Sequence, residues 1–104
     1  SSLIRVPAAL GEYKRAELRS PDPLANPYLA FALIIYAGLY GIQNKIALPK
    51  PVDINLFEAP LETLAQYHKL PENLSKAKKA ARTSEFISKC LPLSLIDIYC
   101  MEKQ

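Results

Sequence analysis

The chain has 104 residues, the size of one small domain, and half of them are apolar while 22% are charged. This balance is typical of a globular protein and excludes a disordered or low-complexity chain. The formal charge of +3 is too small to indicate nucleic acid binding, and no run of like charge is longer than Lys78-Lys79.

Residues 1–22 predict two short strands. The first covers Leu3 to Val6 and ends at Pro7, and the second covers residues 13–19 and ends before Pro21. The loop between them contains Gly11, which can adopt a backbone angle that other residues avoid. Side chains alternate along the second strand, so Ala16 and Leu18 are expected on its buried face.

The opposite face of the second strand carries a charged pattern. It reads Arg15-x-Glu17-x-Arg19, with Arg5 on the neighbouring strand, and alternate residues of a strand lie about 6.6 Å apart. Arginine forks bind phosphate and carboxylate oxygens through two hydrogen bonds, and a carboxylate between them suits Mg²⁺. The pattern therefore predicts a site for nucleotide phosphates and an acidic substrate. The alternative is an exposed strand face with weak ion pairs.

Residues 23–46 predict one long buried helix. Asn26 is a strong N-cap, Pro27 fits the first helical position, and residues 28–42 are apolar almost all round. Gly38 and Gly41 are expected to be points of close packing. A membrane span is the alternative, because residues 23–44 carry no charge. The strongly apolar part has only 15 residues, however, and about 20 are needed to cross a bilayer.

Residues 47–104 predict a loop followed by helices. An extended connector at 48–51 leads to a surface loop at 53–57 whose apolar side chains are expected to turn inward. Asn73 can cap a helix that runs to Arg82, and two further short helices are expected at 84–90 and 93–99. Helix exceeds strand, so the predicted class is α+β. Cys90 and Cys100 match no metal-binding spacing, which favours reduced thiols in the cytoplasm.

The sequence from Arg15 to Ile46 resembles a known family. The segments that carry the resemblance are Ile4-Arg5-Val6-Pro7, Arg15-Ala16-Glu17-Leu18-Arg19-Ser20-Pro21-Asp22-Pro23, Ala25-Asn26-Pro27-Tyr28-Leu29-Ala30-Phe31, Ala37-Gly38-Leu39, Gly41-Ile42 and Asn44-Lys45-Ile46. Together they are similar to the C-terminal catalytic region of glutamine synthetases, over roughly residues 2–57. The rest of the chain resembles the final helical region of that family in pattern only.

The resemblance implies an ATP-dependent ligase that phosphorylates the γ-carboxylate of glutamate and then lets ammonia displace the phosphate, giving glutamine. It implies short antiparallel strands from a split catalytic barrel, the long buried helix, and a C-terminal cluster of short helices. The family's cofactors are ATP and Mg²⁺ or Mn²⁺. The parent protein is expected to be a cytoplasmic, large, ring-shaped homo-oligomer that acts on glutamate, ammonia and ATP, with neither nucleic acid nor membrane as a partner.

The resemblance also implies a role for each charged residue. Glu17 corresponds to a metal ligand, and Arg5 and Arg15 correspond to contacts with the phosphates of ATP. Arg19 corresponds to the catalytic and substrate-binding arginine, which holds glutamate and the transferring phosphoryl group.

Two departures from the family pattern concern binding and control. The loop between Arg5 and Arg15 is shorter than usual and carries Glu12-Tyr13 where many members have a basic stretch, which affects contacts with the nucleotide. Phe57 stands where the regulated enteric type has a tyrosine that accepts AMP. Because phenylalanine has no hydroxyl, that form of control is not expected.

The extent of the resemblance predicts that residues 1–104 are a single partial domain. The sequence starts at Ser1, and the family's upstream glutamates, metal-binding histidine and N-terminal domain have no counterpart in it. We therefore expect a fragment that is inactive alone. Two alternatives remain open at this point, namely a γ-glutamyl-amine (polyamine) ligase of the same superfamily and a non-catalytic assembly or regulatory module.

Overall fold

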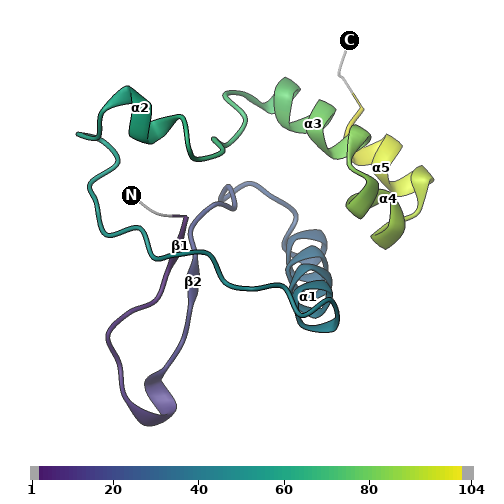
Figure 1. The fold of residues 1–104 in the computed structure, drawn as a ribbon. Helices are drawn as coiled ribbons and strands as arrows, with labels where there is room; N and C mark the ends of the chain where they lie inside the picture. Colours follow the sequence, from purple (N-terminus) through teal and green to yellow (C-terminus); the bar gives the residue numbers. More distant parts are fainter. Residues whose placement is uncertain (1–2, 102–104) are drawn as a thin grey trace.

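A computed structural model describes residues 3–101 of the chain (Figure 1). The elements in chain order are β1 (Ile4–Arg5), the 3₁₀ turn η1 (Gly11–Tyr13), β2 (Glu17–Leu18), α1 (Pro27–Gln43), α2 (Leu61–Leu64), α3 (Leu74–Thr83), α4 (Glu85–Cys90) and α5 (Leu93–Tyr99). The described part is mostly helical and contains a two-stranded antiparallel sheet, which is compatible with the predicted α+β class.

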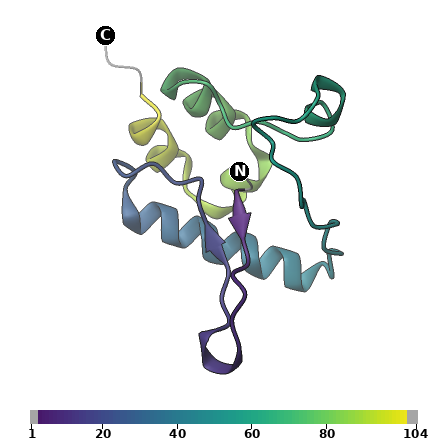
Figure 2. The ribbon, with the colours of Figure 1, turned by 90° about the vertical axis from the view of Figure 1, so that its left-hand side faces the viewer.

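The strands β1 and β2 form a short hairpin at the start of the chain. Arg5 lies opposite Glu17 and Ile4 opposite Leu18, so both strands are shorter than the predicted ranges. Gly11 adopts a φ of +60°, a left-handed conformation that glycine adopts easily and that strains residues with a Cβ atom. In Figures 1 and 2 the loop of the hairpin points away from the helices, which leaves its apolar side uncovered. The expected burial of Ala16 and Leu18 is therefore wrong for this chain, and Leu18 is 42% exposed.

The boundaries of α1 follow from local hydrogen bonds. The side chain of Asn26 accepts from the N–H groups of Tyr28 (3.0 Å) and Leu29 (3.2 Å), and Pro27 occupies the first turn, which confirms the predicted start. At the other end Lys45 has a φ of 49°, and the N–H of Ile46 donates to the carbonyl of Gly41 at 3.0 Å. This left-handed termination normally uses glycine, so the lysine gives no sequence signal for it.

The three C-terminal helices begin where the sequence predicts. The side chain of Asn73 accepts from the N–H of Lys76 at 2.9 Å to start α3, and Ser84 caps α4 through the N–H of Ile87 at 3.2 Å. Pro92 immediately precedes α5. The short helix α2 was not predicted, because no capping side chain marks its start.

A small core joins α1 to the C-terminal helices. Within the described residues, the buried hydrophobic positions are Ile96 and Cys100, at 5% and 4% exposure. Next to them lies a cavity of about 90 Å³, which is lined by Leu29, Leu33, Ala81, Ile87, Leu91, Leu95, Ile96, Tyr99 and Cys100. The rings of Tyr40 and Phe86 meet edge to face at 5.8 Å, which attaches α4 to the C-terminal half of α1. The inner face of α1 is thus partly covered.

The end of α5 is held by two side chains from α3. The guanidinium of Arg82 donates to the carbonyl of Cys100, and the ammonium of Lys78 donates to the carbonyl of Met101, each at 2.8 Å. The last carbonyls of a helix have no partner within it, and cations are favourable near that end. The basic residues of α3 thus complete the C-terminus of α5, in addition to forming a solvated face.

The outer face of α1, which we define as Phe31, Ile35, Gly38 and Ile42, is uncovered. Phe31, Ile35 and Ile42 are 66%, 62% and 76% exposed, and no residue of α1 is buried. A Cβ added to Gly38 or to Gly41 would meet nothing within 4 Å. Burial of this helix and close packing at its glycines are therefore not confirmed in this chain.

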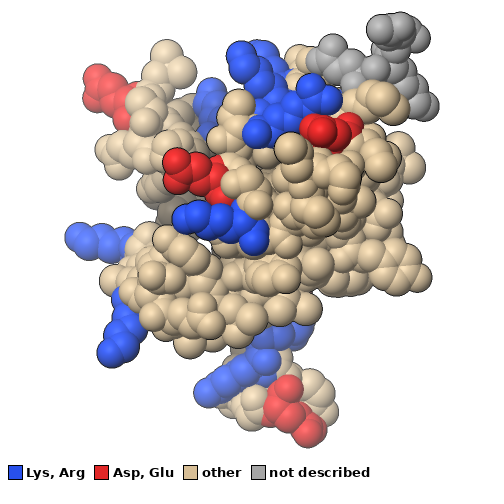
Figure 3. All heavy atoms as spheres, turned by 90° about the vertical axis from the view of Figure 1, so that its right-hand side faces the viewer, with Lys and Arg blue, Asp and Glu red and all other residues tan. Residues whose placement is uncertain are grey.

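The total surface shows how open the fold is. The chain exposes 9543 Å², whereas a globular protein of 11.6 kDa is expected to expose about 5,800 Å². Its radius of gyration is 16.0 Å, against about 13 Å for a compact domain of this length. Figure 3 shows a broad surface without charged side chains on the side that carries the helices. In the 53–57 loop, Phe57 is likewise 89% exposed instead of turned inward.

The hydrophobicity of α1 also raised a membrane span as an alternative. Among residues 3–101, no helix combines the length and the apolar character that crossing a bilayer would require.

Candidate functional site

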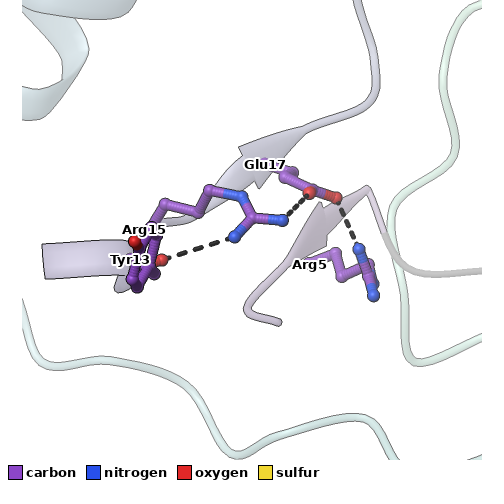
Figure 4. A network of polar contacts seen from close by, with 4 residues as sticks. All are labelled: Arg5, Tyr13, Arg15 and Glu17. Carbon is purple, nitrogen blue, oxygen red and sulfur yellow. Dashed lines mark hydrogen bonds and ion pairs between the residues drawn. The ribbon is translucent and has the colours of Figure 1, made fainter. Parts of the chain in front are cut away.

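The hairpin brings three of the four predicted site residues together (Figure 4). Arg5 and Glu17 are cross-strand partners, so their side chains share one face, and Arg15 lies two residues before Glu17 on the same face. The Nη1 atom of Arg5 lies 2.9 Å from Oε2 of Glu17, and the Nη2 atom of Arg15 lies 3.2 Å from Oε1. Each carboxylate oxygen therefore has its own guanidinium partner. We call these three residues the arginine–glutamate cluster.

A main-chain acceptor adds to the cluster. Nη1 of Arg15 donates to the carbonyl oxygen of Tyr13 at 3.3 Å, so this guanidinium is held by two groups at once. The acceptor is available because η1 ends at Tyr13 and the chain then becomes extended. Sequence reasoning missed this contact, because a backbone carbonyl carries no residue-type signal.

The cluster lies at the surface and carries a net positive charge. The side chains of Arg5 and Arg15 are 47% and 55% exposed, and that of Glu17 is 34% exposed. The hydrogen bond from Arg5 is the main reason that the pKa of Glu17 is lowered from its ordinary value of 4.5, and partial desolvation opposes this shift. Glu17 is therefore ionised at neutral pH, and the two exposed ion pairs are individually weak.

Arg19 lies beside the cluster along the chain. Its main-chain N–H donates to the carbonyl of Leu3 at 2.7 Å, which extends the pairing of the hairpin by one step. Its side chain is exposed, and within residues 3–101 it forms no hydrogen bond or ion pair. The structure thus gathers Arg5, Arg15 and Glu17, and it leaves the guanidinium of Arg19 available to a ligand.

The donor set suits an anion better than a metal ion. Within the described part of the chain, no group of three or more His, Cys, Asp or Glu residues is placed to hold a metal. Glu17 offers one carboxylate, and both of its oxygens are already bound by arginines. A hard cation such as Mg²⁺ needs several oxygen ligands, so these residues do not form a metal site by themselves. Two guanidinium forks at one place are, by contrast, suited to phosphate.

Comparisons with known proteins identify what the chain is similar to. The family described as "Glutamine synthetase, catalytic domain" matches residues 1–104. The chain is 42% identical over 101 residues to the glutamine synthetase of Methanocaldococcus jannaschii, covering 95% of this chain and 22% of that protein. It is 47% identical over 93 residues to the glutamine synthetase of Staphylococcus aureus strain MW2, covering 88% of this chain and 21% of that protein. It is 41% identical over 106 residues to that of Methanosarcina mazei, covering all of this chain and 24% of that protein. The chain therefore spans less than a quarter of the length of these curated relatives.

Proposed function

Because the chain belongs to the glutamine synthetase catalytic-domain family, we propose that it forms part of an ATP-dependent ligase that joins ammonia to glutamate. In this reaction the γ-carboxylate of glutamate accepts the terminal phosphoryl group of ATP, which leaves ADP and γ-glutamyl phosphate. Ammonia then attacks the acyl carbon and expels inorganic phosphate, which gives glutamine. The names of the relatives support the ligase family and do not favour the polyamine ligase or the non-catalytic module.

The arginine–glutamate cluster is the observation in this chain that carries the proposal. Phosphoryl transfer depends on holding the phosphates in line and on stabilising their charge, and arginines do both. We propose that Arg5 and Arg15 contact the phosphates of ATP and that Arg19 binds glutamate and the transferring phosphoryl group. Two guanidinium groups that converge on one carboxylate, 2.9 and 3.2 Å away, support the first assignment. The guanidinium of Arg19, which has no side-chain partner among the described residues, supports the second.

The remaining parts of the site would come from outside this chain. We propose that Glu17 is one ligand of a Mg²⁺ or Mn²⁺ site whose other ligands lie elsewhere in a longer protein, because residues 3–101 supply a single carboxylate at the cluster. We also propose that the hairpin is part of a split barrel within a large ring-shaped homo-oligomer. The uncovered outer face of α1 and the large exposed surface support a neighbouring layer of protein there. The 104-residue chain alone should therefore have no turnover.

A chimera tests the proposed function. The segment of the Methanocaldococcus jannaschii glutamine synthetase that matches this chain is replaced by residues 1–104, and phosphate release is measured with ATP, glutamate and ammonia. We expect activity that requires all three substrates. In the chimera, Arg15→Gln should lower kcat/KM for ATP by roughly tenfold or more, since a charge-assisted phosphate contact is lost.

The matched control is Lys14→Gln, which removes the same charge one residue away, at a position with no ion pair to the arginine–glutamate cluster among the described residues. It should change kcat/KM by less than about twofold, because an exposed charge outside the site contributes little. A chimera that assembles like the parent relative but releases no phosphate would contradict the proposed function. Equal losses in the two variants would remove Arg15 from the phosphate contacts.

A further inference from the structure

The carboxylate of Glu17 occupies the position that an anionic ligand of the cluster would need. Arg5 binds one of its oxygens and Arg15 binds the other, and neither oxygen is shared. Figure 4 shows Glu17 between the two guanidinium groups, so that one planar anion bridges both. A phosphate group makes the same kind of two-oxygen contact with arginine. The side chain thus imitates the ligand that the proposed function assigns to these arginines.

We infer that, when neither metal nor ligand is bound, Glu17 is an internal competitor that holds Arg5 and Arg15 and that a polyphosphate must displace. This inference rests on the proposed function, because it assumes that the two arginines bind phosphates. A ligand with one charge exchanges one weak ion pair for another and gains little. A polyphosphate carries several charges and can bind both guanidinium groups together, so it outcompetes the carboxylate. The cluster therefore selects polyphosphates over small monovalent anions.

The exposure of the cluster sets the size of the effect. Ion pairs between side chains that are about half exposed are weak and screened by salt, so each costs a competing ligand no more than a severalfold loss of affinity. The carboxylate also repels an incoming anion, because its charge stays within a few ångströms after displacement. Replacing it by a neutral group of the same shape should remove both effects.

The test uses inorganic tripolyphosphate as the probe and the full 104-residue chain. Calorimetric titrations are made at low ionic strength with a chelator present, so that no divalent metal contributes. Glu17→Gln should bind tripolyphosphate roughly fivefold or more tighter than the unmodified chain. Glu17→Ala should also bind tripolyphosphate more tightly than the unmodified chain. This second variant is needed because the glutamine amide can keep a hydrogen bond to an arginine, whereas alanine cannot. Acetate should gain less affinity than tripolyphosphate in the same variants, because it displaces one ion pair and its single charge is repelled less by the carboxylate.

Glu12→Gln is the matched control, because Glu12 lies on the exposed turn of the same hairpin and has no ion pair within the described residues. It should strengthen tripolyphosphate binding by less than about twofold. If Glu12→Gln gains as much as Glu17→Gln, the effect is one of net charge and the inference is wrong. It is also wrong if Glu17→Gln binds no tighter than the unmodified chain.

A second measurement separates this inference from the proposed function. The ¹⁵N resonances of the Nε atoms report on each guanidinium, and those of Arg5 and Arg15 should shift both on adding tripolyphosphate and on introducing Glu17→Gln. Tripolyphosphate can shift the resonances of the unmodified chain while Glu17→Gln leaves the affinity for tripolyphosphate unchanged. That result would support the proposed phosphate contacts and would contradict the competitor role of Glu17. If tripolyphosphate shifts neither resonance in any variant, both the proposed phosphate contacts and the competitor role are wrong.

Discussion

Replacing Ile96 by alanine should cost most of the stability that the C-terminal helices gain from their core. Ile96 is 5% exposed and lies beside the 90 Å³ cavity, on the side of α5 that faces α1 and α3. The change removes the three carbon atoms beyond Cβ, and each buried carbon group contributes about 0.8 kcal/mol. The side chains around Ile96 already leave a cavity, so they are not expected to fill the space that the substitution opens. The enlarged cavity therefore adds to the loss of stability. We expect a loss of about 2.5 to 4 kcal/mol in the free energy of unfolding.

Ile98 provides an internal control on the same helix. It is 70% exposed, so Ile98→Ala removes the same atoms from a position where most of them contact water, and the expected loss is about 0.7 kcal/mol. The change in helix propensity is the same for both variants, so it cancels in the comparison. The difference between the two variants therefore reports burial alone.

Urea unfolding followed by circular dichroism at 222 nm measures both variants. The protein is kept dilute, and the titration is repeated at a second concentration so that association does not enter the result. The midpoint should fall far more for Ile96→Ala, with the slope unchanged. Equal shifts for the two variants would refute the reasoning, because the buried and exposed positions on α5 would then be energetically the same.

Three further outcomes are expected. In the chimera described above, Arg19→Lys should lower kcat/KM for glutamate by on the order of 10²-fold, since lysine keeps the charge but loses the planar fork; a loss below threefold in steady-state kinetics would exclude the assigned role. The stability that the ion pairs of Glu17 contribute should be fully present above pH 4.5 and should be lost as the pH falls through the lowered pKa of Glu17. A ¹³C titration of the Glu17 carboxyl should therefore show a midpoint below 4.5, and this midpoint should rise in Arg5→Gln. A midpoint at or above 4.5 in the unmodified chain would contradict this expectation. The 104-residue chain should associate through the outer face of α1, so Phe31→Glu should reduce the mass measured by sedimentation. Leu24→Glu, at a 94% exposed position outside the helix, should reduce this mass far less. A chain that stays monomeric at high concentration would argue against that surface.

The helix boundaries could be read from the sequence because they are set by local chemistry. Asn26, Asn73 and Ser84 each accept hydrogen bonds from N–H groups two or three residues ahead, so the signal and the structure lie within one turn. The end of α1 is different. There the left-handed residue is Lys45, which is held by contacts that residue type does not reveal.

The burial of α1 could not be read from the sequence in the same way. The apolar run from Tyr28 to Ile42 indicates that the helix is stable only when other protein covers it. Whether it is buried depends on which other segments are present to pack against it. Only the inner face finds neighbours within these residues, and Phe31 and Ile35 stay exposed. The same reason applies to Leu18 in the hairpin.

The charged face of the candidate site was predicted in part. Alternation along the strand correctly placed Arg15 and Glu17 together, and the pairing with Arg5 followed from the expected hairpin. The ion pairs among these groups were predicted only as the alternative of weak surface pairs. The roles of the four residues in catalysis remain predictions, since they depend on ligands that charge patterning alone does not define.

The hydrogen bond from the main-chain N–H of Asn26 to the hydroxyl of Tyr99 joins residues that are 73 positions apart. Asn26 also caps α1 with its side chain, so the first turn of α1 cannot fray without releasing the last turn of α5. The amide of Asn26 should thus exchange with solvent deuterium at the rate at which the C-terminal helices open, although its own segment is at the surface. Within residues 3–101, the β1–β2 hairpin has no hydrogen bond to the helices, and it should exchange on its own, faster timescale. The hairpin and the helices joined through Asn26 and Tyr99 should therefore open separately, and the boundary between them falls in the few residues that separate Arg19 from Asn26.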